Sequence, residues 1–195
     1  YVGDRIHVEL RLDAEVDGQL EIGTEIIRVG ADGTAIPTAT GRCRVVAPAS
    51  PLPGVTSGSH PFEEGDAELY GLRPGMSAST SRVFAVADLD EYGDLTGDRN
   101  PIFRDDQEAR ARGFKRRIVP WPLLAGMFSD LLGTRLPGRG TGWMKQQLRY
   151  PSAAYPGDTL TATVSIVRLR AAKELVNLTT RVTAGDGRVV CDGDA

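Results

Sequence analysis

The two ends of the chain repeat each other at a constant offset of 154 positions. At this offset Tyr1-Val2-Gly3-Asp4 falls on Tyr155-Pro156-Gly157-Asp158, and Asp32-Gly33 falls on Asp186-Gly187. Two motifs that stay in register without a gap favour a duplicated unit over a chance match. We therefore expect the fold to contain the same element twice.

Both copies alternate apolar and polar residues between these two motifs. The apolar positions are Ile6, Val8, Leu10 and Leu12 in the first copy and Leu160, Ala162, Val164 and Ile166 in the second. A period of two is typical of a strand with one buried face, and an Asp-Gly pair favours the corner of a hairpin. We expect each copy to form strand, turn and strand, and both copies to join one continuous sheet.

The composition divides the chain into three parts. Residues 1–46 are expected to form a first unit of strands, and residues 75–195 a second unit. Residues 47–74 are rich in Pro, Gly and Ser, which disfavour helix and ladder pairing, so they predict a linker.

The second unit is expected to contain helices as well as strands. We expect its first strand at 83–86, followed by a helix that Asp88 caps. Residues 122–132 predict a second helix, because their apolar side chains recur at intervals of three and four and give it a broad apolar face.

A motif in the second unit resembles the signature of a known enzyme family. Residues 96–103 read Thr-Gly-Asp-Arg-Asn-Pro-Ile-Phe. They resemble the Ser/Thr-Gly-Asp-x-Asn-Pro-Ile/Leu-His signature of the MaoC-like, or R-specific hydratase, family of hotdog-fold enzymes. The resemblance implies that Asp98 belongs to an Asp-His dyad that adds water to an acyl thioester or removes it. Phe103 stands at the position of the family's His.

Further landmarks extend the resemblance over about residues 71–195. Residues 108–114 match the family's helix and its Gly-Phe ending, and residues 147–150 and 155–158 fit its closing strands. Where the family writes Ile-Val-His-Gly, this chain has Ile118-Val119 followed by Pro120-Trp121-Pro122. A second landmark is therefore also changed.

The resemblance implies an α+β hotdog fold, in which a curved antiparallel sheet wraps a central helix. Together with the repeat, it predicts a double hotdog with a degenerate first half. The first half is strands alone, and the chain begins at Tyr1 without Met, so we expect this half to be incomplete at its N-terminus.

The candidate site residues follow from this resemblance. Asp98 either takes part in catalysis or only holds the turn before Asn100, whose own role is structural or substrate-binding. The backbone N–H of Trp121 stands where the family binds the thioester oxygen, at the start of the central helix, although the indole can also simply plug the pocket. His60, in the linker, is the candidate to replace the missing imidazole; the other histidine, His7, lies on a strand pattern.

The run from Arg110 to Arg117 is the one local concentration of cations. It is either a solvated helix end or a dock for the phosphates of coenzyme A or of a carrier-protein arm, which would make Arg116 and Arg117 substrate-binding residues. The whole chain has a net charge of -3 and a pI of about 5.5, which argue against nucleic acid and anionic membranes as partners.

Other site classes find no support in the sequence. No apolar run is long enough to cross a bilayer, and no signal-peptide pattern is present. Cys43 and Cys191 lack metal or redox spacing, which predicts reduced thiols in a cytoplasmic protein with no cofactor and no metal.

Two functions remain. The first is a relative of the MaoC-like dehydratases and hydratases that has a non-standard active site. It would act on β-hydroxyacyl or enoyl thioesters of CoA or a carrier protein, in polyketide or fatty-acid metabolism. If it is active, it is a hydro-lyase. The second is an inactive hotdog subunit that binds acyl thioesters or supports an active partner. A hotdog thioesterase ranks last, because no nucleophile is evident. In each case we expect a homo-oligomer or a hotdog partner subunit.

Overall fold

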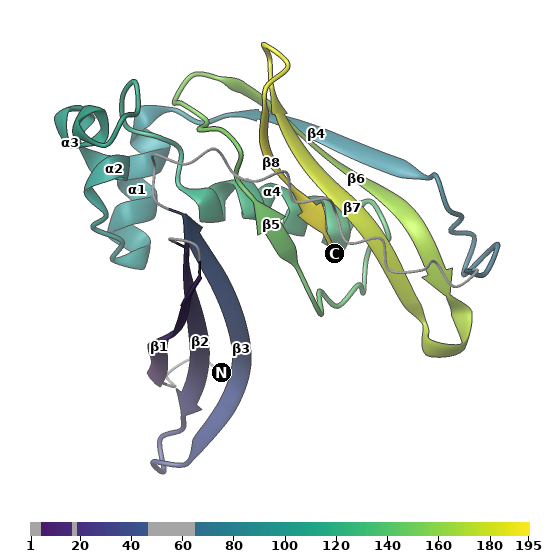
Figure 1. Cartoon of the computed structure of the whole chain (residues 1–195). Coiled ribbons are helices and arrows are strands. Elements are labelled where there is room, and N and C mark those ends of the chain that lie inside the picture. The colour runs from purple at the N-terminus through teal and green to yellow at the C-terminus, as the bar shows by residue number, and fades with distance from the viewer. Residues whose placement is uncertain (1–4, 17–18, 47–64) are drawn as a thin grey trace. The chain divides into compact units, whose positions relative to one another are not determined.

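The computed structural model describes residues 5–16, 19–46 and 65–195 (Figure 1). The chain divides into two compact units, residues 1–55 and 56–195, which we treat separately. The boundaries expected from the sequence, at 46 and 75, stay a prediction. Most of the expected linker, residues 47–64, lies outside the described residues.

The described residues of the second unit form a five-stranded antiparallel sheet and four α-helices. The strand order is β4-β6-β7-β8-β5. The strands are β4 (Ser77–Val83), β5 (Gln147–Arg149), β6 (Thr159–Arg170), β7 (Leu175–Ala184) and β8 (Val189–Asp194). The helices are α1 (Val86–Thr96), α2 (Pro101–Arg104), α3 (Asp106–Ala111) and α4 (Trp121–Thr134), with a short 3-10 turn at Ala171–Lys173.

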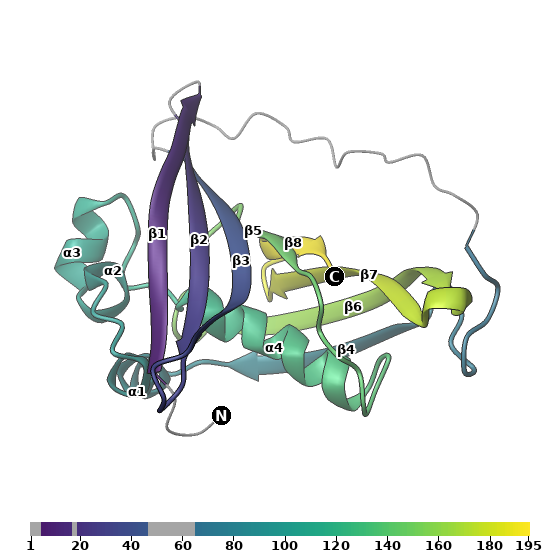
Figure 2. The same cartoon turned by 90° about the horizontal axis from the view of Figure 1, so that it is seen from below.

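Helix α4 lies along one face of this sheet (Figure 2). Its apolar stripe is buried, as predicted for residues 122–132, and consists of Leu124, Met127, Phe128, Leu131 and Leu132. These side chains pack in one core with the inward residues of β6, which are Leu160, Ala162, Val164 and Ile166. The sheet and its central helix therefore have the arrangement expected of a hotdog unit.

The opposite face of the sheet carries hydroxyl groups. Ser77, Ser79 and Ser81 of β4 each pair with a hydroxyl of β6 at 2.9 Å. This face is polar because β6 alternates, so every residue between two core positions points outward.

Two local predictions in this unit were wrong. The first strand was expected at 83–86, but β4 ends at Val83 and the buried Phe84 already leads toward α1. Asp88 was expected to cap the helix, but the N-cap is Ala85 and Asp88 is its third residue, whose carboxylate accepts the Ala85 N–H at 2.6 Å. The carboxylate thus stabilises the same helix end from inside the first turn.

The first unit is a three-stranded antiparallel sheet, ordered β1 (Arg5–Val16), β2 (Gln19–Val29) and β3 (Ala35–Val46). None of its described side chains is buried. Its strands repeat those of the second unit at the offset of 154. When 154 is subtracted from its residue numbers, β6 begins and ends at the same residues as β1. In the same way, the first residue of β8 corresponds to the first residue of β3.

The details of the two sheets agree as well. A bulge follows Leu12 in β1 and the corresponding Ile166 in β6. Gly33 and Gly187 both have left-handed backbones, with φ of 81° and 86°. Asp32 and Asp186 each accept the N–H two residues later, at 2.9 and 3.1 Å. The predicted Asp-Gly corners are confirmed.

The two sheets also differ. The pairing of β1 with β2 is slipped by two residues relative to that of β6 with β7, an even shift that keeps every side chain on its face. The described strands form one sheet within each unit, and one continuous sheet stays a prediction.

Candidate active site

The motif loop connects α1 with α2. Helix α1 ends at Gly97, whose left-handed backbone (φ 73°) lets its N–H reach Gly93 O at 3.0 Å. Asn100 is the N-cap of α2, and its side-chain oxygen accepts the N–H of Ile102 at 3.3 Å. Pro101 starts the helix, as suits a first position. Gly97, Asn100 and Pro101 thus shape the loop that carries Asp98.

Asp98 is half-buried and accepts two hydrogen bonds. One carboxylate oxygen accepts the Asn100 N–H at 2.9 Å, which is the turn-holding contact. The other accepts the phenol O–H of Tyr92 at 3.2 Å. The side chain therefore holds the turn and still presents one oxygen to a proton donor.

Tyr92 was missed by sequence reasoning. It lies on α1, six residues before Asp98, and the two side chains meet because the chain reverses at Gly97. Burial, and after it the charge of Asp98, raises the pKa of the Tyr92 phenol. The phenol is therefore a protonated donor at neutral pH. A Tyr five residues before the Gly at the helix C-cap is the signal that could have pointed to Tyr92.

Phe103 is almost fully buried, at 4% exposure, between Ile102 and Ile118. The Phe103 and Trp121 rings meet edge to face, with centroids 5.5 Å apart and planes at 87°. Such a pair stabilises by about 0.5–1.5 kcal/mol beyond its burial. The two changed landmarks are therefore in contact with each other, and they make an apolar cluster where the resemblance places an imidazole.

Trp121 links this cluster to the main core. Its ring lies 5.8 Å from that of Tyr150, and Tyr150 hydrogen-bonds the thiol of Cys191.

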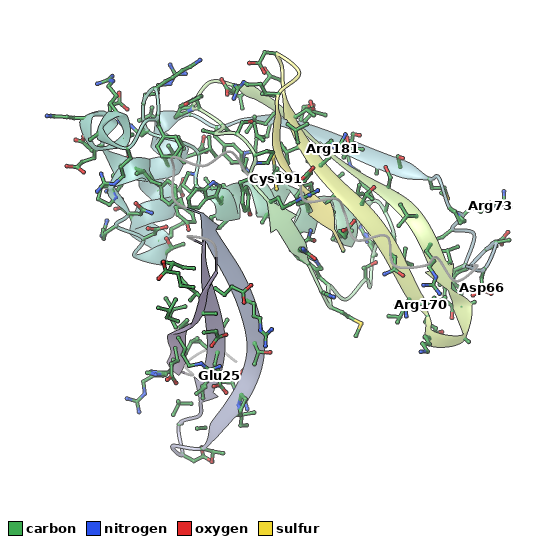
Figure 3. The ribbon with its side chains drawn as sticks, viewed as in Figure 1. Glu25, Asp66, Arg73, Arg170, Arg181 and Cys191 are labelled. Carbon is green, nitrogen blue, oxygen red and sulfur yellow. The ribbon has the colours of Figure 1, made fainter. Side chains whose placement is uncertain are left out.

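Cys191 lies within the sheet on β8 (Figure 3). Burial raises the pKa of this free thiol to about 12, so it is no nucleophile.

The N-terminus of α4 offers one backbone donor in its first positions. Pro120 and Pro122 have no N–H, and the N–H of Leu123 turns back to Pro120 O at 3.0 Å. Within the described part of the chain, no acceptor faces the N–H of Trp121. This amide at a helix N-terminus is suited to bind an oxygen that gains negative charge.

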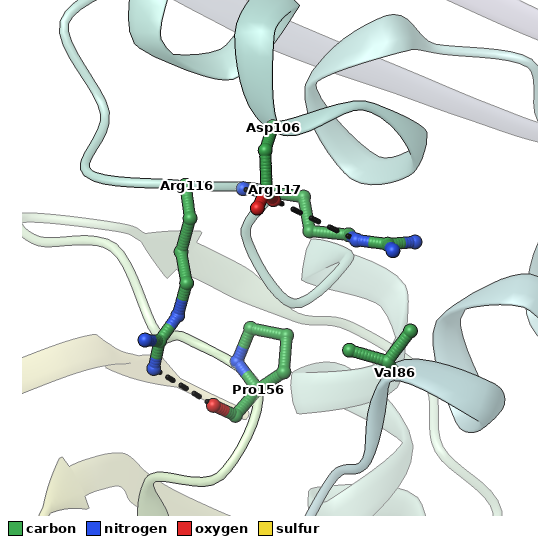
Figure 4. A pocket seen from close by; sticks show the side chains of 5 residues that line it. All are labelled: Val86, Asp106, Arg116, Arg117 and Pro156. Atoms are coloured by element: carbon green, nitrogen blue, oxygen red, sulfur yellow. Dashed lines mark hydrogen bonds and ion pairs between the residues drawn. The ribbon is translucent and has the colours of Figure 1, made fainter.

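Arg116 and Arg117 line a separate open hollow of about 270 Å³ together with Val86, Asp106 and Pro156 (Figure 4). Arg117 forms ion pairs with Asp90 at 3.2 Å and Asp106 at 3.7 Å. Arg116 donates to the carbonyl of Pro156 at 2.9 Å and lies over the Tyr155 ring, with no ion pair to any described residue. Arg116 therefore keeps its charge unneutralised.

The chain was compared with known proteins. The family model of the MaoC like domain matches residues 72–187. The chain belongs to the MaoC-like family. Its second unit is the part that carries this assignment, and the relatives below are hydratases and dehydratases, which are hydro-lyases.

Two relatives resemble the MaoC-like segment in sequence. The (R)-specific enoyl-CoA hydratase of Aeromonas caviae is 36% identical over 124 residues, which are 64% of this chain and 92% of the hydratase. The mitochondrial 3-hydroxyacyl-acyl-carrier-protein dehydratase FERN of Solanum lycopersicum is 33% identical over 141 residues, 71% of this chain and 84% of that enzyme.

Solved structures give the same result for the fold. An (R)-hydratase from A. caviae superposes on 65% of this MaoC-like chain and 96% of its own, with a TM-score of 0.61 and 36% identity. A MaoC-like dehydratase aligns with 99% of this chain and 70% of its own at a TM-score of 0.71; at 15% identity this is a likeness of fold.

The predicted site residues that the structure describes fall into three groups in this MaoC-like chain. Phe103 and Trp121 are in contact, and Asp98 hydrogen-bonds Asn100. Arg116 and Arg117 line the separate hollow. His60 lies outside the described residues. Over the described ranges, no group of acidic, Cys or His side chains could hold a metal, and no helix could cross a membrane.

Proposed function

We propose that this chain is a hydro-lyase for enoyl or β-hydroxyacyl thioesters of CoA or a carrier protein, with Asp98 and Tyr92 in place of an Asp-His dyad. The hydrogen bond between the Tyr92 phenol and the Asp98 carboxylate carries this proposal, since it joins a base to a proton donor. The family assignment supports the reaction class.

The proposed pair balances the proton transfers of hydration. Asp98 takes a proton from water as the water oxygen bonds to the β-carbon. The phenol of Tyr92 gives its proton to the α-carbon. The proton then passes from Asp98 to Tyr92 along their hydrogen bond, which restores both groups. The N–H of Trp121 holds the thioester oxygen while it carries negative charge.

We expect this reaction to be slow. A phenol with a raised pKa is a weaker acid than an imidazolium, and the apolar contact of Phe103 with Trp121 keeps water from the usual dyad position. Loss of a well-placed acid or base costs about a hundred- to ten-thousand-fold in rate.

We test the proposal by measuring hydration of a short enoyl-CoA by the wild type and by single variants. Asp98→Asn is expected to lower the residual rate about a hundredfold and Tyr92→Phe about tenfold. Glu91→Gln, which removes an exposed carboxylate from helix α1, is the matched control and should leave the rate within about twofold. A rate that Asp98→Asn leaves unchanged contradicts the proposal.

The second candidate is an inactive subunit that binds acyl thioesters or supports an active partner subunit. The closed packing of Phe103 on Trp121 favours it. The same assay separates the two candidates: binding of acyl-CoA without turnover by the wild type supports the inactive subunit.

The proposal extends to the architecture. We propose that the chain is a double hotdog whose first half is degenerate. The shared strand bounds, the shared bulge and the shared Asp-Gly corners support the duplication. The alignment of a MaoC-like dehydratase over 99% of this chain supports a fold of that size.

A further inference from the structure

Gly93 lies inside helix α1, where a glycine is costly. A glycine within a helix lowers stability by about 1 kcal/mol relative to alanine. Gly93 is buried, and a side chain at this position would meet two groups at once. Its Cβ would overlap Nη1 of Arg104 and would lie 3.1 Å from the backbone oxygen of Asp98. The glycine therefore makes room for the guanidinium beside the loop that carries Asp98.

The guanidinium of Arg104 is partly buried and incompletely paired. Its Nη2 lies 3.5 Å from the carboxylate of Asp94, and the side chain as a whole is 30% exposed. Its Nη1 is buried and has no hydrogen-bond partner among the described residues. A buried N–H without an acceptor costs about 1–3 kcal/mol. The fold retains this cost at the place where the guanidinium meets Gly93 and the motif loop.

The carboxylate of Asp94 brackets the motif loop from both ends. It lies 3.1 Å from Nη1 of Arg99 and 3.5 Å from Nη2 of Arg104. Arg99 follows Asp98 directly, and Arg104 is the last residue of α2. Both ion pairs are largely open to water, so each contributes little by itself. The buried contact of Nη1 with Gly93 is the part of this arrangement that water does not screen.

We infer that Arg104 is a positioning residue for Asp98. Its guanidinium, seated against Gly93, fixes the backbone of the motif loop. The Asp98 carboxylate is thereby kept on the Asn100 N–H and the Tyr92 phenol. This inference rests on the proposed function, in which Asp98 is the base, and Arg104 acts through the loop rather than by contact with the substrate. A displacement of about 1 Å in a site can cost a hundredfold in rate.

Two variants of the 195-residue protein displace the guanidinium in different ways. Arg104→Ala removes it, whereas Gly93→Ala pushes it aside and keeps its charge on the chain. If the guanidinium acts by its place against Gly93, both changes remove the same contact, and the double variant should match Arg104→Ala within about twofold. Gly133→Ala, in a helix where the added Cβ meets nothing within 4 Å, is the control. Circular dichroism checks that the helices persist.

Two measurements report the position of Asp98. The Asn100 N–H donates to the Asp98 carboxylate, so its hydrogen exchange reports the loop without any need for activity. Exchange should be about tenfold faster in each single variant and unchanged in the control. In enoyl-CoA hydration, kcat should fall about tenfold while KM stays within about twofold, because a misplaced base slows the chemical step and leaves substrate binding intact.

Arg104→Lys keeps a cation near Asp94 but has no second nitrogen to lie against Gly93, so its kcat should fall as in Arg104→Ala. Full activity of this variant would show that charge alone suffices and would overturn the inference. Additive losses in the double variant, or an Asn100 exchange rate that neither single variant changes, would overturn it as well. A wild type without hydration, together with faster exchange in both variants, would reject the proposed function and keep the role of Arg104 in the loop.

Discussion

At the scale of single residues, Arg116 and Arg117 differ in what surrounds their charge. Asp90 and Asp106 neutralise Arg117, whereas Arg116 donates to a carbonyl and lies over a ring but forms no ion pair with a described residue. A phosphate placed in their hollow would gain more from Arg116, because the carboxylates that offset Arg117 repel an anion.

We therefore expect Arg116→Ala to weaken acyl-CoA binding about three- to tenfold at low salt, and less at high salt, where an exposed contact is screened. Arg117→Ala should weaken it less. Titration calorimetry at two salt concentrations measures both. If neither variant changes the affinity at low salt, the arginines are only a solvated helix end.

The individual site residues were visible in the sequence, but their contacts were not. Phe103 and Trp121 stand out as changes in two separate motifs, yet their edge-to-face contact joins positions 18 apart through the packing of α2 on α4. Tyr92 reaches Asp98 only because the chain reverses at Gly97. Tertiary contacts of this kind leave no local periodicity to detect.

At the scale of elements, β5 depends on a glycine in its neighbour. A Cβ on Gly193 would lie 1.8 Å from the backbone oxygen of Gln147, which starts β5. The strand would have to move, since backbone cannot rotate away. In contrast, a Cβ on Gly133 in α4 would meet nothing within 4 Å.

We expect Gly193→Ala to lower the free energy of unfolding by about 1–3 kcal/mol, as overpacking does. Gly133→Ala, the matched control, should raise it by up to about 1 kcal/mol, because alanine favours helix over glycine. Urea unfolding measures both values. Equal stabilities for the two variants would mean that β5 does not pack this closely on β8.

Elements with a strong period were predictable. The alternation in β6 and the stripe of α4 each reflect burial of one face, and both predictions were confirmed. The position of β4 was missed, because an edge strand with three outward serines shows little apolar signal, while the nearby apolar run at 83–86 belongs to the entry of α1.

At the scale of the whole molecule, the two units have the same strand plan but differ in what they contain. The second unit carries the family motif and a buried helix, whereas the described residues of the first form strands alone. The sequence repeat predicted the strands and the Asp-Gly corners that the two units have in common. It did not predict the slip of two residues between the two strand pairings, since a repeat specifies equivalent elements and not their register.

The central claim is that the contact between Phe103 and Trp121, rather than the motif loop, keeps hydration slow. The most direct measurement is the rate of enoyl-CoA hydration by Phe103→His combined with Trp121→Gly, which restores the family's His at position 103 and its Gly at position 121. We predict about a hundredfold increase over the wild type, a smaller increase for Phe103→His alone, and loss of the gain when Asp98→Asn is added. A folded double variant that binds acyl-CoA but is no faster than the wild type would contradict the claim.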